Sequence, residues 1–152
     1  MGQELFPLQW RMDTAEKLKI DSTFVPCPAE DGDEIYANGI FLFNITKIFE
    51  HIEQNPEQYP LEEIPIENLG LFSSGLNDDH MAQADVKKPI ILAEIAPGRY
   101  VVIDGNHRLE RSRRMLMKSV PAYRLHVHQH IPFLIEKRAY HAYVEYWNGK
   151  IG

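Results

Sequence analysis

The chain has 152 residues, 44% of them hydrophobic, and a formal net charge of −6 at pH 7. This length predicts one domain with a real core, and the negative charge argues against a protein that coats DNA through its overall electrostatic field. No apolar run approaches the ~20 residues of a membrane span, and residues 1–6 lack the regions of a signal peptide, so we expect a cytoplasmic protein with no membrane partner.

The first 34 residues predict an irregular arm. Aromatic and polar residues mix there without a clear period, and the stretch closes with Pro26, Pro28 and the acidic run 30–34. Prolines and a run of like charges are typical of an exposed loop. The arm is therefore expected to end in such a loop before the first regular element.

A strand followed by an amphipathic helix is predicted next. Residues 35–37 and 39–43 have strand composition, and the Asn44 that follows them is a preferred helix N-cap. Pro56 and Pro60 end the helix and open a turn. The helix is recognised by apolar residues at positions i, i+3, i+4 and i+7, which are Ile45, Ile48, Phe49 and Ile52.

The middle of the chain predicts a β-hairpin preceded by a short strand. Residues 64–66 form that strand, and the polar stretch 73–85 has room for a helix. The apolar run 89–93 and residues 100–103 have strand composition, and the turn residues Ala-Pro-Gly-Arg at 96–99 lie between them. Two strand-like runs joined by such a turn are typical of a hairpin.

The last third of the chain predicts a helix, a strand and a final helix. We expect a helix that begins after Gly105, at Asn106 or His107, and runs to about Lys118, followed by a strand over 119–125. Pro121 indicates an edge or strand-start position because proline lacks an N–H. The final helix is indicated by Phe133, Tyr140, Val144 and Trp147 at helical spacing, with Asn148 and Gly149 predicted to stop it.

Together these elements predict a single α+β domain, in which a small mixed sheet is packed by helices. Its expected parts are an N-terminal arm (1–34), a strand–helix extension (35–60), a core (61–126) and a C-terminal helix (127–152).

The turn between residues 103 and 107 is the strongest candidate for a functional site. A helix N-terminus presents free N–H groups and a partial positive charge, and Gly105 just before it lets a ligand approach the backbone closely. His107 and Arg108 would project from the first helical turn, where a guanidinium can bind phosphate with two parallel hydrogen bonds. The alternative is purely structural, with Asp104 forming the turn, Asn106 capping the helix and Gly105 supplying positive φ.

The helix after this turn carries a basic stripe. Leu109, Ser112 and Leu116 are expected to face the core, and one acid, Glu110, stands among the charges. A basic segment in an acidic protein indicates a focused anion site, and it leaves open a nucleic-acid partner; a solvated helix face is the alternative. The stripe consists of His107, Arg111, Arg114 and Lys118.

The stretch 100–109, Tyr-Val-Val-Ile-Asp-Gly-Asn-His-Arg-Leu, followed by Ser-Val-Pro-Ala at 119–122, resembles the central motif of the ParB/sulfiredoxin superfamily. Residues 64–66 and 88–91 stand in the order of that fold's earlier strands, so the resemblance covers about residues 61–126. It implies a ParB/sulfiredoxin-like core that binds ATP or CTP, with Mg²⁺, at this turn.

The resemblance also narrows the function. Sulfiredoxin's nucleophilic cysteine corresponds to Asn106, which disfavours sulfinic-acid repair, and residues 71–80 lack the arginine of the partition proteins. The motif is closest to the branch that resembles free-serine kinases, which implies a phosphotransferase or nucleotide hydrolase; a nuclease, or a non-catalytic nucleotide-sensing or DNA-associated module, stays open. Phosphoryl transfer also needs a carboxylate for the acceptor, and besides Asp104 and Glu94 the candidates are Asp78 and Asp79.

These considerations give the predicted site residues. Catalytic roles are assigned to Asp104, His107 and Glu94, and nucleotide contacts to Gly105, Asn106, His107, Arg108 and Arg111.

Three histidines form a second pattern. His126, His128 and His130 alternate, so on a strand their imidazoles would point to one side about 6–7 Å apart, with His80 or His141 as possible further metal ligands. No Cys or Glu-x-x-His pattern supports a metal site, and we predict none.

Overall fold

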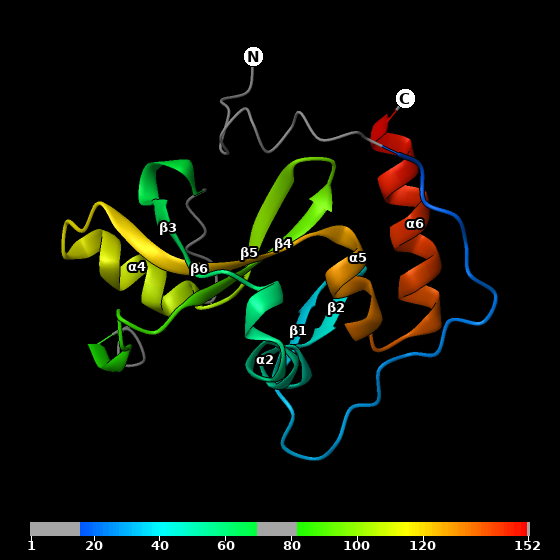
Figure 1. The fold of residues 1–152 in the computed structure, drawn as a ribbon, viewed down its shortest axis with the longest axis horizontal. Helices are drawn as coiled ribbons and strands as arrows, with labels where there is room; N and C mark the ends of the chain where they lie inside the picture. Colours follow the sequence, from blue (N-terminus) through cyan, green and yellow to red (C-terminus); the bar gives the residue numbers. More distant parts are fainter. Residues whose placement is uncertain (1–15, 70–81, 152) are drawn as a thin grey trace.

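A four-stranded mixed sheet lies at the centre of the computed structural model, which describes residues 16–69 and 82–151 (Figure 1). Strands β4 and β6 are parallel, and the other two pairs are antiparallel. In sheet order the strands are β3 (Glu62–Pro65), β6 (Ser119–Leu125), β4 (Ile90–Ala96) and β5 (Arg99–Asp104). The predicted α+β class, mixed sheet and β4–β5 hairpin are therefore confirmed.

Helices cover both faces of this sheet. All seven residues of β4 are buried, and they alternate between two apolar clusters: Ile91 and Ala93 join one, Ile90 and Leu92 the other. Helix α4 (Asn106–Arg114) contributes Leu109 to the second cluster, and helix α6 (Lys137–Ile151) packs its buried face into the first. A strand buried on both faces explains why residues 89–93 read as a continuous apolar run.

The strand–helix extension forms as its local sequence predicts. Strands β1 (Ile35–Asn38) and β2 (Phe41–Asn44) make an antiparallel pair, and helix α2 (Ile45–Gln54) begins directly after it. The Asn44 side chain accepts a hydrogen bond from the Lys47 N–H at 3.0 Å, which confirms the predicted N-cap. Shorter elements complete the described chain: 3₁₀ helices at Pro56–Gln58, Ile66–Asn68 and Ile131–Phe133, and helix α5 (Val127–His130).

Pro121 lies near the start of β6, which is one of the two positions predicted for it, although β6 is not an edge strand. Strand β6 runs between β3 and β4, and Pro121 is its third residue. The parallel pairing of β4 with β6 begins only at Ala122, so at Pro121 the strand has a register partner on one side alone, Glu63 of β3. A missing N–H is tolerated there because no β4 residue is paired with this position.

Helix α4 is shorter than predicted, and Leu116 is not in the core. The helix ends at Arg114, and Leu116 is 88% exposed with φ of +59°. The N–H of Leu116 donates to the Arg113 carbonyl at 3.1 Å, and that of Met117 donates to the Ser112 carbonyl at 3.0 Å. This pair of bonds is a Schellman motif, in which the left-handed position usually holds glycine. The chain must reverse here to begin β6 at Ser119, and this reversal overrides the helical periodicity.

The C-terminal helix also differs from its predicted bounds. It starts at Lys137, after Phe133, and continues through Asn148 and Gly149 to Ile151. The Asn148 side chain does not terminate the helix because it bonds to the distant residue Leu18, accepting from its N–H at 2.7 Å and donating to its carbonyl at 2.9 Å.

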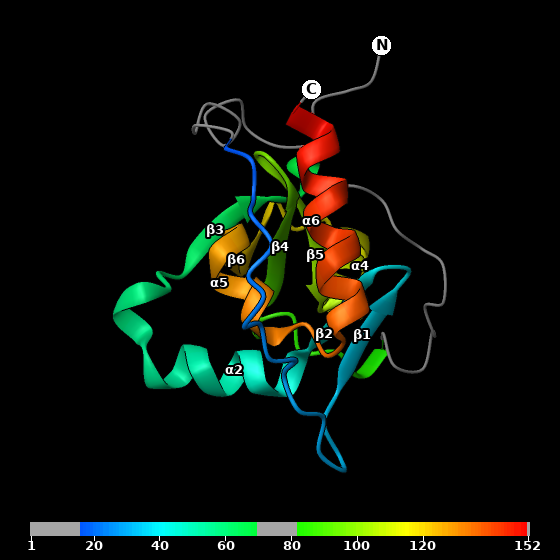
Figure 2. The same ribbon diagram turned by 90° about the vertical axis from the view of Figure 1, so that its right-hand side faces the viewer.

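The N-terminal arm runs beside α6, as both ribbon views show (Figure 2). Within residues 16–34 the backbone is irregular, as predicted, but it is held by side chains of α6. Trp147 donates its indole N–H to the Glu16 carbonyl at 2.8 Å, the Asp21 N–H donates to the Tyr140 hydroxyl at 2.7 Å, and Phe24 stacks on Tyr140. Residues 16–24 of the arm are thus part of the folded domain.

None of the helices within residues 16–69 and 82–151 combines the length and apolar composition needed to cross a lipid bilayer.

Candidate phosphate-binding turn

Gly105 makes the turn from β5 into α4. Its φ is +100°, in the left-handed region that the sequence predicted. A Cβ at this position would lie 2.6 Å from Ile90 Cγ2 and 2.9 Å from an Arg108 Nη, so a side chain is excluded by space as well as by conformation. The turn can therefore bring the backbone of α4 close to β4 only with glycine here.

The N-terminus of α4 has no side-chain cap. Gly105 is the N-cap, and the first bond within the helix runs from the Leu109 N–H to the Gly105 carbonyl at 2.8 Å. The N–H groups of Asn106 and Arg108 precede that bond, in the part of a helix where the backbone offers no intrahelical acceptor. Backbone donors of the first helical turn and the positive end of the helix dipole therefore meet at the turn.

Asp104 and Arg108 form an ion pair across this turn. One Nη of Arg108 lies 2.7 Å from an Asp104 carboxylate oxygen and donates to the Pro89 carbonyl at 3.0 Å. The Asp104 side chain is 10% exposed and that of Arg108 is 15% exposed. Among the described residues, Arg108 Nε is buried without a hydrogen-bond partner. The guanidinium is thus anchored to the protein with donor capacity left over.

A pocket of about 380 Å³ opens at the turn. One wall is residues 103–108, and the other is residues 34–37 at the start of β1. Burial raises the pKa of Glu34 above its ordinary value, and the neighbouring Asp104 carboxylate raises it further. Two carboxylates, an arginine and a helix N-terminus therefore border one small space.

Glu34 was not among the predicted site residues. The sequence placed it in an exposed acidic loop, and in the structure it is solvent-exposed but also lines this pocket. Its position directly before a predicted strand was the available signal, because the first residues of a strand are held in place by the sheet. What no local pattern indicates is that β1 would lie against the turn at residue 105.

Some predicted site residues lie elsewhere. Arg111 does not line the pocket, and its guanidinium donates to the Ala82 carbonyl. Glu94 pairs with Tyr100 at the far end of the hairpin, whereas Asp104 pairs with Ile91, a separation of three residues or about 10 Å along β4. The prediction that Glu94 serves the same site as Asp104 is not supported by this arrangement.

The candidate carboxylates Asp78 and Asp79, the histidine His80 and most of the predicted helix in 73–85 fall outside the described residues.

The basic stripe of α4 is partly neutralised. Glu110 lies 3.1 Å from both Arg113 and Arg114, as an i,i+3 and an i,i+4 pair. With Arg111 on the Ala82 carbonyl, the basic charges of the helix face other parts of the protein as well as solvent. A nucleic-acid contact through this helix stays a prediction.

The three alternating histidines are not on a strand. Strand β6 ends at Leu125, His126 is the N-cap of α5, and His128 and His130 lie within that short helix. Their side chains diverge in burial, because His130 is fully buried whereas His126 and His128 are exposed. In residues 16–69 and 82–151 no three His, Cys, Asp or Glu side chains form a group that could hold a metal ion.

Comparison with models of known protein families gives no match, and comparisons with curated proteins and with solved structures give no significant match either. The resemblance of residues 61–126 to the ParB/sulfiredoxin superfamily stays a prediction.

Proposed function

We propose that this protein binds the phosphate chain of a nucleotide, ATP or CTP, together with Mg²⁺ at the turn formed by residues 104–108. The observation that carries the proposal is the convergence of the uncapped α4 N-terminus and Arg108 on one pocket that also holds two carboxylates. Backbone N–H groups at a helix N-terminus and a guanidinium are the usual protein donors to phosphate oxygens.

The donor set also fits the cation. Mg²⁺ in nucleotide sites is held by one or two carboxylates with the substrate phosphates, and Glu34 and Asp104 border the same pocket. Bound Mg²⁺ would neutralise phosphate charge. Without a cation, two carboxylates beside an anion would repel it, so nucleotide affinity is expected to depend on Mg²⁺.

A thermal-shift panel tests the binding. ATP, CTP, GTP and inorganic phosphate are added with and without Mg²⁺, and a nucleotide at 100 times its Kd adds about 2.7 kcal/mol to the free energy of unfolding. We expect ATP or CTP with Mg²⁺ to raise Tm. If no nucleotide raises the Tm of the native chain, the proposal is wrong.

Two variants localise the binding. Asn106→Asp places a negative charge in the first turn of α4, where it favours the helix but repels phosphate, so binding is expected to weaken while the fold is retained. Arg138→Ala, on the exposed start of α6, is the control, because it changes the net charge by the same amount at a residue that does not line the pocket. Equal nucleotide shifts in the two variants would place the binding elsewhere.

Phosphoryl transfer is the second candidate, favoured by the raised pKa of Glu34 beside Asp104. A carboxylate of raised pKa is a better general base. In this step the acceptor hydroxyl gives its proton to a carboxylate and its oxygen bonds to the γ-phosphorus. The bond from that phosphorus to the bridging oxygen breaks, which leaves a nucleoside diphosphate.

Product analysis distinguishes the candidates. ATP with free serine tests for phosphoserine and ADP, and single-stranded DNA tests for cleavage. Glu34→Gln is expected to lose turnover and to weaken nucleotide binding to a smaller extent, because Asp104 is left to hold Mg²⁺. Nucleotide binding with no product from either substrate would favour a sensing module.

A further inference from the structure

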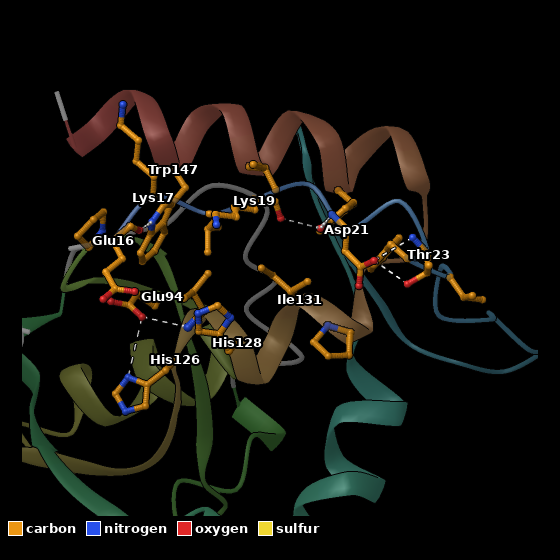
Figure 3. Close-up of a pocket in the computed structure, with 18 of the residues that line it drawn as sticks. Glu16, Lys17, Lys19, Asp21, Thr23, Glu94, His126, His128, Ile131 and Trp147 are labelled. Carbon is orange, nitrogen blue, oxygen red and sulfur yellow. Dashed lines mark hydrogen bonds and ion pairs between the residues drawn. The ribbon is translucent and has the colours of Figure 1, made fainter. Parts of the chain in front are cut away.

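A second cavity, of about 1030 Å³, lies between the N-terminal arm, α6 and the β4–β5 turn (Figure 3). Its walls are the arm at residues 16–25, the inner face of α6, and the β4–β5 turn with α5. None of residues 103–108 lines it. Its volume is at the upper end of the range for small-molecule sites, ~300–1,000 Å³.

The arm lines this cavity, and its backbone is held in place there by hydrogen bonds and by a buried side chain. Hydrogen bonds with the side chains of Asn148, Trp147 and Tyr140 fix its backbone between Glu16 and Asp21. Leu18 is buried in the main core, which anchors the same segment. The apolar part of the lining is aromatic and aliphatic: Phe24, Val25, Ile131, Tyr140, Val144 and Trp147. Such a surface is suited to the apolar body of a ligand.

Glu94 supplies a buried carboxylate at the cavity. The residue is 7% exposed, and its two carboxylate oxygens each accept one backbone N–H, from Gly98 at 2.8 Å and from Val127 at 3.0 Å. Within the described residues, the only basic side-chain nitrogen within 4 Å of this carboxylate is His126 Nδ1, at 3.9 Å. That nitrogen already lies 2.6 Å from the Tyr100 hydroxyl.

The carboxylate therefore has hydrogen bonds but no lysine or arginine as counter-ion in the part of the chain that the structure describes. Buried charges in proteins are normally paired. Each carboxylate oxygen has a second lone pair beyond the one used by its backbone donor. Four charged residues of the arm also line the cavity, and Lys17 and Lys19 balance Glu16 and Asp21. Glu94 is thus the unbalanced charge of the lining.

We propose that this cavity binds an organic cation, a ligand with a primary ammonium group on an aromatic or aliphatic body. The ammonium pairs with Glu94, and the body packs on the apolar wall formed by Phe24, Trp147 and Val144. Aromatic rings near the cation add attraction through their negative faces. This site is separate from the nucleotide site, and each can exist without the other.

A matched series of three ligands tests the charge: 4-phenylbutylamine, 4-phenylbutanol and 4-phenylbutyrate, which share one apolar body. Binding to the full chain is followed by ¹H–¹⁵N spectra, in which the Gly98 and Val127 amides report on the Glu94 carboxylate directly. We expect the amine to bind at least about tenfold more tightly than the alcohol, and the carboxylate more weakly still. The amine should shift both amides.

Variants complete the test. Glu94→Gln is expected to reduce amine affinity about tenfold or more and leave that of the alcohol unchanged, and Glu57→Gln, an exposed acid on the 3₁₀ helix Pro56–Gln58, is the matched control. If Glu94→Gln fails to fold, Phe24→Ala serves instead, since it removes part of the apolar wall and leaves the carboxylate intact. Equal affinities across the three ligands, or amine-induced shifts confined to residues 104–108, would overturn the proposal.

Discussion

Asp104 and Glu94 are buried carboxylates on neighbouring strands, yet the protein compensates their charges differently. Asp104, 9% exposed, pairs with the guanidinium of Arg108 at 2.7 Å. Glu94, 7% exposed, accepts two neutral backbone N–H groups, and among the described residues its basic neighbour is the His126 imidazole at 3.9 Å. In the first, a carboxylate and a guanidinium form an ion pair that lines a small pocket. In the second, one carboxylate accepts hydrogen bonds from Gly98 in the β4–β5 turn and from Val127 at the start of α5.

This difference in charge compensation determines which ligand charge each proposed site would accommodate. At the proposed nucleotide site Asp104 is already paired with Arg108, so a bound anion would need Mg²⁺ to offset its charge. At the proposed amine site Glu94 has no lysine or arginine partner among the described residues, so a cationic ligand would supply one. The two sites also differ in which groups a substitution leaves without a partner. Loss of Asp104 leaves the charged Arg108 guanidinium without its carboxylate, whereas loss of Glu94 leaves the Gly98 and Val127 N–H groups without an acceptor.

The largest expected effect is that of Asp104→Ala. It leaves Arg108 with most of its guanidinium buried and one carbonyl as partner, so we expect the free energy of unfolding to fall by about 3 kcal/mol, measured by urea denaturation. The double variant Asp104→Ala with Arg108→Leu should lose less than the sum of the single losses, because no charge is stranded. Strict additivity would show that the ion pair is not coupled.

Glu94→Ala is expected to cost about 2 kcal/mol. The Gly98 and Val127 N–H groups lose their acceptor, and the removal of a buried charge offsets part of that loss. Hydrogen exchange should accelerate at these two amides in particular. A loss larger than that of Asp104→Ala would reverse the comparison between the two carboxylates.

His130 makes the Glu94 side of the molecule sensitive to acid. Burial lowers the pKa of His130 from 6.5 to about 3, and its Nε2 lies 2.6 Å from the Glu94 carbonyl oxygen. Because the unfolded chain binds this proton first, stability is complete above pH 6.5 and falls progressively as pH drops toward 3. At pH 5.5 the loss from this group is about 1 kcal/mol relative to pH 7.

The control for this pH dependence is His130→Gln, which retains a donor for the carbonyl and does not titrate. Its unfolding free energy, measured at both pH values, should fall by about 1 kcal/mol less than that of the native chain. Parallel losses in the two proteins would assign the acid sensitivity to other groups.

Glu34→Gln has the smallest expected effect and the opposite sign. The pKa of Glu34 is raised in the folded state, so ionising it near Asp104 opposes folding as pH rises through that folded pKa. The variant should be slightly more stable than the native chain at pH 7, by a fraction of a kcal/mol because Glu34 is exposed. The gain should vanish below the ordinary glutamate pKa, where both states are protonated.

Sequence patterns predicted the structure correctly where the deciding interactions lie within one helix, turn or hairpin. Asn44 caps α2 with its own side chain, and Gly105 adopts positive φ because the turn itself requires it. The same applies to the hairpin, whose two strands are adjacent in sequence. In each case the deciding interactions span only a few residues, so their signal is present in a short window of sequence.

The predictions that failed concern positions whose structure depends on contacts between residues far apart in sequence. Glu34 reaches Asp104 only because β1 lies against the β5–α4 turn, and Asn148 continues the helix because its side chain bonds to Leu18. Glu94 was assigned to the turn from its place on the preceding strand, but the hairpin register puts it at the opposite end. These contacts depend on tertiary packing, which a periodicity does not encode.

The attachment of the arm to α6 has a consequence for how the protein is made. Leu18 and Asn148 are 130 residues apart in sequence, so the arm leaves the ribosome long before its partner helix exists. At translation rates of ~5–20 residues per second, that interval lasts on the order of ten seconds. During this time the aromatic and apolar residues of the arm have no place to dock. The final closure of the domain therefore waits for synthesis of its last helix, and a nascent chain stalled before Trp147 would present the arm to chaperones.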